Sequence, residues 1–133
     1  MIYLLDTHAF IWATLETGNL GAKGKNIIFD RNNEICVSTV SFWEISLKAG
    51  LNKYSFKNVN IKDFPGYARD MDFTVIDMQE DETISFHELP QKKDHSDPFD
   101  RMLIWQAITR GLIMISKDKF FKQYNEDGLK LIW

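Results

Sequence analysis

Two aspartates, Asp97 and Asp100, stand close together at the start of a helical pattern in the segment DHSDPFDRMLIWQAITRG. Asp97 precedes Pro98, so it predicts a helix N-cap followed by proline at the first helical position. Asp100 shares a helical face with Leu103 and Ala107, which is the face expected to point toward the core. Because an unpaired charge is costly there, Asp100 requires a partner such as a cation.

Three further acids follow apolar runs of the chain. Asp6 comes directly after the first run, Glu44 lies in an SFWE segment after the second, and Asp118 follows a later one. Each has an ordinary structural explanation, because Asp6 and Asp118 can cap helices and Ser41 with Glu44 matches a capping box. Glu44 can also pair with Lys48 one helical turn later. If the runs are neighbouring parallel strands, however, the acids gather at one edge, where they would repel each other unless a cation is bound.

The residue types favour magnesium or manganese over zinc. Carboxylate oxygens are hard ligands, the single cysteine has no partner, and His8, His87 and His95 share no metal-ligand spacing. Mg²⁺ bound by carboxylates commonly works on phosphate groups, and a metal-activated water can attack a phosphodiester. The chain also lacks a P-loop, a G-x-G-x-x-G turn and a G-x-S-x-G elbow. This combination indicates metal-dependent phosphate chemistry without a side-chain nucleophile.

The elements that position these acids alternate along the chain. Apolar runs predict strands at Ile2–Leu5, Ile35–Val37, Phe73–Ile76, Leu112–Ile115 and Leu129–Trp133. Helical patterns cover Thr7–Leu15, Ala22–Arg31, Val40–Leu51, Ile61–Met71, Asp81–Leu89 and Pro98–Arg110, with a short turn over Asp118–Tyr124. We therefore expect an α/β fold with a mostly parallel central sheet, whose strands are largely buried on both faces by flanking helices. Such sheets place ligands at the carboxyl ends of the strands.

The composition is that of one globular domain over residues 1–133. The chain is 44% apolar and has a single cysteine, Cys36, which excludes an internal disulfide framework. Without a secretory leader pattern or an apolar run near the roughly 20 residues of a membrane span, we expect a cytoplasmic protein with no membrane partner. The net charge of -3 gives no general attraction to nucleic acid, so polyanion binding must come from local lysine groups. Two such groups are Lys53, Lys57 and Lys62, and Lys117, Lys119 and Lys122.

At these residues the sequence resembles the PIN-domain ribonucleases, in particular the VapC-type toxins of bacterial type II toxin-antitoxin pairs. The likeness extends over nearly the whole chain and is carried by Leu5–His8, Ser38–Lys48, His95–Ile104 and Ser116–Trp133. The resemblance implies a PIN-like sheet of about five strands, a homodimer, an RNA substrate and a cognate antitoxin. It also implies that Mg²⁺ or Mn²⁺ is held by an acidic quartet that hydrolyses RNA, formed here by Asp6, Glu44, Asp100 and Asp118. We expect Asp6 and Asp100 to be the primary ligands, with Glu44 and Asp118 completing the shell or binding through water.

Several polar residues beside the acids are candidates for orienting a carboxylate or contacting substrate. The hydroxyls of Thr7 and Ser116 are expected to orient a carboxylate or water, whereas Ser38 is more simply explained as a cap. Lys48 either neutralises Glu44 or meets substrate. The remaining candidates are His95, expected to fix its loop by a hydrogen bond, Asp97, close enough to take a metal-bound water, and Arg101, expected to pair with Asp97 or an RNA phosphate.

The sequence departs from the family pattern at two places, and it also predicts an apolar surface on the first helix. Trp105 stands where a small residue is expected, and the loop Asn125 to Gly128 is longer than usual. Phe10, Ile11, Trp12 and Leu15 form a wide apolar surface on the first helix, of which we expect one part to face the core and the rest to meet a second subunit or the antitoxin.

Two alternatives to an active ribonuclease remain. The first is a signalling module like a response-regulator receiver, with Asp77 as the only candidate phosphoacceptor, although the acidic pair and the lysine of such modules are lacking. The second is a PIN-like domain that binds RNA without cleaving it. The RNA target itself depends on surface shape and is not encoded in these motifs.

Overall fold

The computed structural model describes residues 1–133 and has a five-stranded sheet at its centre, with strand order β3-β2-β1-β4-β5. All neighbouring strands pair in parallel, which confirms the mostly parallel sheet expected from the sequence. The strands are β1 Ile2–Leu5, β2 Glu34–Ser38, β3 Thr74–Ile76, β4 Ile113–Ile115 and β5 Lys130–Ile132. The helices are α1 Thr7–Leu15, α2 Ala22–Ile28, α3 Thr39–Gly50, α4 Phe64–Asp70, α5 Glu80–Ser85 and α6 Pro98–Arg110. Short 3₁₀ helices are η1 Thr17–Asn19, η2 Ile61–Asp63, η3 Phe86–Glu88 and η4 Lys119–Asp127.

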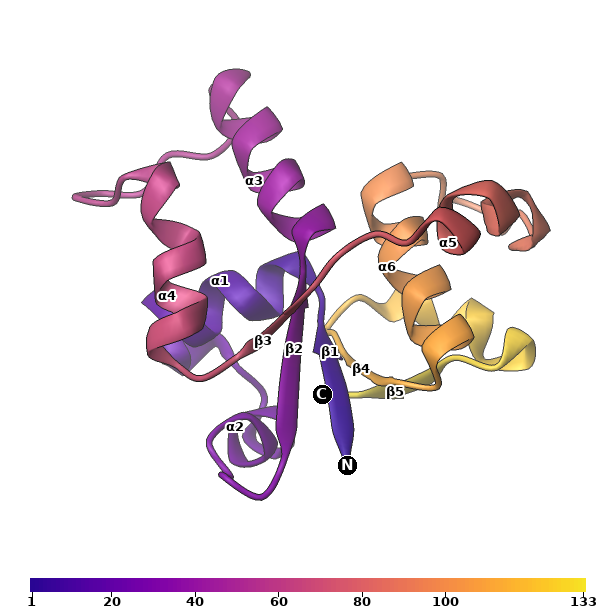
Figure 1. The fold of residues 1–133 in the computed structure, drawn as a ribbon, viewed down its shortest axis with the longest axis horizontal. Coiled ribbons are helices and arrows are strands. Elements are labelled where there is room, and N and C mark those ends of the chain that lie inside the picture. The colour runs from indigo at the N-terminus through magenta and orange to yellow at the C-terminus, as the bar shows by residue number, and fades with distance from the viewer.

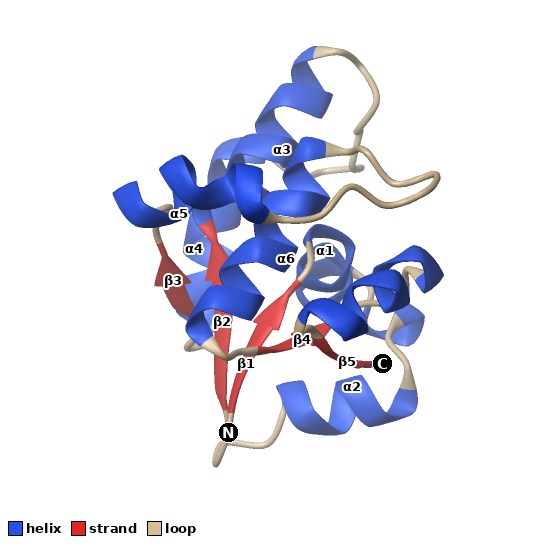
Figure 2. Ribbon diagram, turned by 90° about the vertical axis from the view of Figure 1, so that its right-hand side faces the viewer, coloured by secondary structure: helices blue, strands red, loops and turns tan.

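Helices cover both faces of the sheet, so the core has two halves. In Figure 1, α1, α2 and α4 lie on one side of the strands, and α6 with the yellow coil of η4 lies on the other. Figure 2 shows α6 in front of the sheet. Successive strand residues point to opposite faces, so the first half holds Tyr3, Leu5 and Val37, and the second holds Leu4 and Cys36. The central strands are therefore buried on both faces.

The edge strand β3 differs from the sequence prediction. Thr74 and Val75 are exposed, so this strand is not buried on both faces. It pairs only with β2, and α4 and the chain leading to α5 do not enclose it. The expectation of full burial is confirmed for the central strands and is wrong for β3.

Some helix boundaries also differ from the prediction. The second helix ends at Ile28 rather than Arg31, because the Asp30 carboxylate accepts a hydrogen bond from the Asn32 N–H and forms a turn (2.9 Å). The pattern over Ile61–Met71 is divided into η2 and α4, with proline in the first turn of α4. The turn after Asp118 continues as η4 as far as Asp127.

The apolar side chains of α1 are largely used within the chain. Phe10 and Ile11 are buried, and Trp12 and Leu15 pack against the same core. Phe10 and Ile11 are therefore the part of this apolar surface that faces the core, as expected, and a contact of the rest with a second subunit or the antitoxin stays a prediction. Trp105 is also used internally, because its indole N–H donates to the Ser85 hydroxyl and ties α6 to α5 (3.1 Å).

Every helix falls short of the length and apolarity that crossing a bilayer would require.

Candidate metal centre

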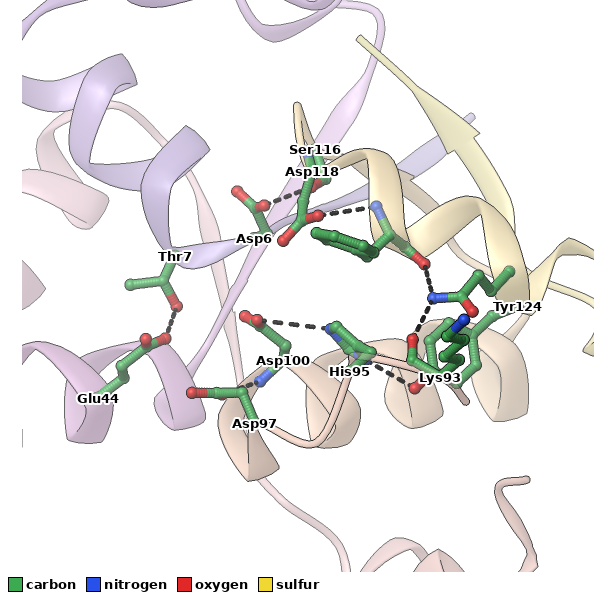
Figure 3. A network of polar contacts seen from close by, with 12 residues as sticks. Asp6, Thr7, Glu44, Lys93, His95, Asp97, Asp100, Ser116, Asp118 and Tyr124 are labelled. Carbon is green, nitrogen blue, oxygen red and sulfur yellow. Dashed lines mark hydrogen bonds and ion pairs between the residues drawn. The ribbon is translucent and has the colours of Figure 1, made fainter. Parts of the chain in front are cut away.

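The predicted acids meet at the carboxyl edge of the sheet. Asp6 follows β1, Asp118 follows β4, and Glu44 and Asp100 project from α3 and α6, which converge above the strand ends (Figure 3). They line one cavity of about 300 Å³. Its walls consist of Asp6, His8, Trp12, Glu44, Lys48, Asp100, Lys117 and Asp118. The parallel order of β1 and β4 brings two of the acids together, and the two helices add the others.

The local capping roles and the shared cavity involve the same side chains. The Asp6 carboxylate accepts from the Ala9 N–H at 2.8 Å, and that of Asp118 accepts from the Phe120 N–H at 2.9 Å. The second oxygen of Asp118 is not used by its cap. The second oxygen of Asp6 accepts from the Ser116 hydroxyl, but each carboxylate oxygen keeps a lone pair for another partner. The structural and the functional explanation of these acids are therefore compatible.

The capping-box interpretation of Ser41 and Glu44 is wrong. The N-cap of α3 is Ser38, whose hydroxyl accepts from the Val40 N–H at 3.1 Å. This agrees with the cap explanation of Ser38. Glu44 lies one turn further into the helix and pairs instead with Lys48, as the spacing predicted.

Burial and mutual repulsion shift the pKa values of two of the acids. Burial, together with the neighbouring charges of Asp97, Glu44, Asp6 and Asp118, raises the pKa of Asp100 to about 8. Burial also raises the pKa of Asp6 to about 6, although hydrogen bonds from Ser116 and Ala9 oppose that change. Ionising both carboxylates therefore costs free energy, and a bound cation would offset that cost.

Two groups of potential ligand atoms share Asp100. The atoms of His95, Asp100 and Asp118 lie within 4.8 Å of one another, and so do those of Glu44, Asp97 and Asp100. Oxygen donors dominate, and a single imidazole nitrogen is present. This donor set fits Mg²⁺ or Mn²⁺ better than zinc.

Asp6 lines the same cavity but belongs to neither of those groups. One of its oxygens accepts from the Ser116 hydroxyl at 2.5 Å, and the other accepts from the Ala9 N–H. Its role as a primary ligand stays a prediction, and the geometry puts Asp100 at the centre of the acids.

The hydroxyls expected to orient the carboxylates are placed to do so. Thr7 donates to Glu44 at 2.5 Å and lies 3.0 Å from the Ser41 hydroxyl. Ser116 donates to Asp6 and accepts from the Asp118 N–H at 3.1 Å, so it links two acids. Both side chains are buried. Their orientation is therefore fixed by the packing around them.

His95 forms the loop-fixing hydrogen bond that the sequence suggested. Its Nδ1 lies 2.7 Å from the Tyr124 hydroxyl, and its Nε2 faces an Asp100 oxygen at 3.6 Å (Figure 3). Burial lowers the pKa of His95 despite the nearby acids, which favours a neutral ring at neutral pH. Tyr124 was not identified from the sequence, because nothing local links it to a histidine so far along the chain.

Arg101 has a local partner that differs from both predicted ones. Its guanidinium is buried and donates to the carbonyl oxygens of Leu89 and Pro90, at 2.8 and 3.2 Å. The group also lies over the Phe86 ring. It therefore fastens α6 to the segment before it and faces neither Asp97 nor the cavity.

The cavity contains three side chains that the sequence analysis did not place in the site. His8 and Trp12 lie one turn apart on α1, and Lys117 precedes Asp118. The only sequence signal that could have identified them is their distance along the chain, because each lies within two helical turns of a predicted acid. Asp77, the candidate phosphoacceptor, follows β3 and does not line the cavity, which weighs against the receiver alternative.

The comparisons with known proteins agree with the parallel α/β fold. The sequence matches the PIN domain family over residues 3–127, and the chain belongs to that family. None of the curated proteins matches the sequence significantly.

Three solved structures are similar in fold to the whole chain. A chain of VapBC2 from Rickettsia felis, bound to a DNA fragment from their promoter, is 22% identical with a TM-score of 0.72, and the match covers 100% of this chain and 99% of that one. DNA-bound VapBC from Salmonella typhimurium is 17% identical with a TM-score of 0.67, covering 99% and 97%. VapBC-5 from Mycobacterium tuberculosis, a member of the VapBC family of toxin-antitoxin systems, is 16% identical with a TM-score of 0.60, covering 98% and 97%. At these identities the likeness shows the fold.

Proposed function

We propose that this protein is a Mg²⁺- or Mn²⁺-dependent endoribonuclease that acts as the toxin of a type II toxin-antitoxin pair, and that residues 1–133 form one PIN-like domain. The observation that carries the proposal is the convergence of Asp6, Glu44, Asp100 and Asp118 around one cavity, with Asp97 close to Glu44 and Asp100. Lys48 is the only lysine or arginine that forms an ion pair with these acids, and its partner is Glu44. Membership of the PIN domain family and the fold shared with VapBC structures support the same reading.

The acids would hold the metal around Asp100. Asp100 takes part in both potential ligand groups, Glu44, Asp97 and Asp118 each take part in one, and Asp6 lines the remaining wall. A bound divalent ion supplies a water of lowered pKa and offsets the charge that develops on the phosphate.

The surrounding residues fix the acids and supply no nucleophile of their own. Ser116 holds Asp6, Thr7 holds Glu44, and both hydroxyl protons are directed at carboxylates. Because these hydroxyls are buried and already donating, hydrolysis by water is favoured over a covalent route.

An antitoxin and a second subunit are the protein partners proposed. Trp43, Leu47 and Leu51 form an apolar stripe on and just after the outer face of α3, with exposed fractions of 57%, 39% and 58%. A stripe of this kind is typical of a protein interface. The homodimer, the cognate antitoxin and the cytoplasmic location remain predictions from the sequence.

The test is RNA cleavage by the purified protein with Mg²⁺ or Mn²⁺, with and without EDTA. We expect cleavage that depends on the metal and falls by roughly 100-fold or more in Asp6→Asn and Asp100→Asn, since each variant removes a carboxylate from the site. Asp77→Asn is the matched control, because it removes an exposed acid outside the cavity. Full activity in Asp6→Asn or Asp100→Asn would contradict the assignment.

The same preparation separates the two alternatives. Stable phosphorylation of Asp77 by a small phosphodonor, without nuclease activity, would favour the receiver. RNA binding with no cleavage under any metal condition would favour an inactive PIN-like domain.

A further inference from the structure

A groove lined by lysines adjoins the acidic cavity on the β5 side of the sheet. Lys117, Lys119 and Lys122 line this second cavity of about 320 Å³, with Trp133 among its apolar walls. We call it the lysine groove. It shares Lys117 and Asp118 with the acidic cavity, so the two adjoin.

The charges of the lysine groove are not neutralised within the chain. Lys48 and Lys92 are the lysines that form ion pairs, with Glu44 and with Glu126 and Asp127. Lys117, Lys119 and Lys122 make none, and all three are exposed. The surface charge therefore changes sign between the two adjoining cavities, from carboxylates in one to unpaired ammonium groups in the other. A ligand that spans both cavities must be negatively charged where it meets the lysines, and it must meet the acids through a bound cation.

An aromatic pair connects the two cavities. Trp12 lines the acidic cavity and Trp133 lines the lysine groove, and their ring centroids are 5.7 Å apart. The Lys117 ammonium lies 5.8 Å from the centroid of the Trp12 ring. Lysines that track a backbone, interleaved with aromatic rings that contact bases, are typical of surfaces that bind single-stranded nucleic acid.

Burial of the acids favours a single strand over a duplex. Asp6 and Glu44 are only 6% and 2% exposed, so a reacting phosphate must enter a recess. A flexible strand can bend into it, whereas a phosphate in an A-form duplex is held in place by its paired helix.

We propose that the lysine groove holds the phosphates of single-stranded RNA on one side of the bond to be cut, and that Trp12 and Trp133 contact an unpaired base there. This inference rests on the ribonuclease function proposed above. The lysines act as positioning residues, because they touch the strand beside the reacting phosphate rather than that phosphate.

The chain offers a matched control for the three lysines. Lys53, Lys57 and Lys62 are also exposed and form no ion pair, but none of them lines either cavity. A triple substitution to glutamine in either group removes the same charge from the protein.

The experiment measures binding of a fluorescein-labelled oligouridylate by anisotropy in EDTA, where no cleavage occurs, across a range of salt concentrations. In the variant carrying Lys117→Gln, Lys119→Gln and Lys122→Gln we expect affinity to fall by roughly 10-fold or more, with the slope of log affinity against log salt smaller by about 2. In the variant carrying Lys53→Gln, Lys57→Gln and Lys62→Gln we expect a change within about twofold. Circular dichroism confirms that both variants fold, since all six side chains are exposed.

Several results would overturn the inference. RNA affinity should not fall equally in both triple variants, and it should not stay unchanged in the groove variant. A duplex of the same length should not bind as tightly as the single strand. Polyglutamate should not compete for the lysine groove as strongly as unlabelled RNA does. Such competition would indicate an acidic protein segment as the occupant.

Cleavage kinetics separate this inference from the proposed function. Metal-dependent cleavage by the wild type with an unchanged KM in the groove variant would overturn the groove alone. Lysine-dependent binding of RNA by a protein that never cleaves it would overturn the ribonuclease function and leave the groove in place. If both hold, the groove variant raises KM more than it lowers kcat.

Discussion

At the scale of single residues, the proposed chemistry depends on buried carboxylates, whose ionised form is disfavoured by burial and by neighbouring negative charge. Asp100 lies near four other acids, and burial together with their charge raises its pKa to about 8. The same carboxylate faces His95, and burial lowers the pKa of this ring, which disfavours a compensating positive charge there. Asp100 is therefore the residue at which removing a charge and binding a cation should have the clearest consequences.

Asp100→Asn should stabilise the metal-free protein at pH 8 by about 1–3 kcal/mol and have much less effect near pH 5. The ordinary pKa of Asp is 3.8 and the folded value is about 8. Between these values the folded state binds the proton more tightly, so the wild type loses stability as pH rises through this interval, and Asn removes that loss. Urea unfolding in EDTA across this pH range measures the effect. Asp77→Asn serves as control, and equal stabilisation at pH 5 and pH 8 would contradict the explanation.

Ser116→Ala should lower metal-dependent cleavage by about 10- to 100-fold without unfolding the chain. The variant removes the hydrogen bond to Asp6, which opposes the rise in the Asp6 pKa, and the acceptor of the Asp118 N–H. The acid limb of the pH–rate profile should therefore move to higher pH. Ser116→Thr retains the hydroxyl and should restore most of the activity, whereas a loss of activity with an unchanged pH profile would indicate a purely structural role.

At the scale of elements, the start of α6 holds Asp100 in place. The Asp97 carboxylate accepts from the Asp100 N–H at 2.9 Å, proline occupies the first turn, and Gly111 ends the helix with a φ of 66°. One carboxylate thus caps the helix that carries the next one, so cap and site are coupled. The same cap adds to the negative charge around Asp100.

Asp97→Ala and Asp97→Asn should separate these two contributions. Alanine removes the cap and should destabilise the protein by about 1 kcal/mol, whereas asparagine is as good an N-cap as aspartate. Both remove the charge that helps to raise the Asp100 pKa. If metal affinity depends on the charge of Asp97, both variants should lower it, and if only the position of Asp100 matters, Asp97→Asn should bind metal like the wild type. Calorimetric titration with Mn²⁺ and urea unfolding provide the two readouts.

At the scale of the whole molecule, strand order decides which acids meet. β1 lies between β2 and β4. The segments that follow these three strands therefore leave the sheet side by side at its carboxyl edge, and the acids they carry meet there. The folded state therefore gathers carboxylates that are far apart in the unfolded chain. A cation that binds only the gathered acids must stabilise the fold.

Mn²⁺ should raise the Tm of the wild type by several degrees in a concentration-dependent way, since an excess of about 100-fold over Kd contributes about 2.7 kcal/mol. Asp100→Asn should abolish most of that rise. Thermal unfolding with MnCl₂ measures it, and KCl at matched ionic strength controls for screening. An equal rise with both salts would show that screening, rather than a bound ion, is responsible.

The sequence by itself determined the alternation of strands and helices, the Asp97 cap and the presence of acids at the strand ends. These features depend on nearby residues, because periodicity, capping and turn formation act over a few positions. They are sufficient to predict a parallel α/β sheet with an acidic edge.

Only the tertiary structure decided how distant residues meet. It put Asp100 between two groups of ligand atoms, gave Arg101 the Leu89 carbonyl as partner, and joined His95 to Tyr124. It also brought Lys117, after β4, alongside Trp12, more than a hundred positions earlier in the chain. Such contacts depend on strand order and on the paths of the loops, which are set by packing of the entire core rather than by any local pattern.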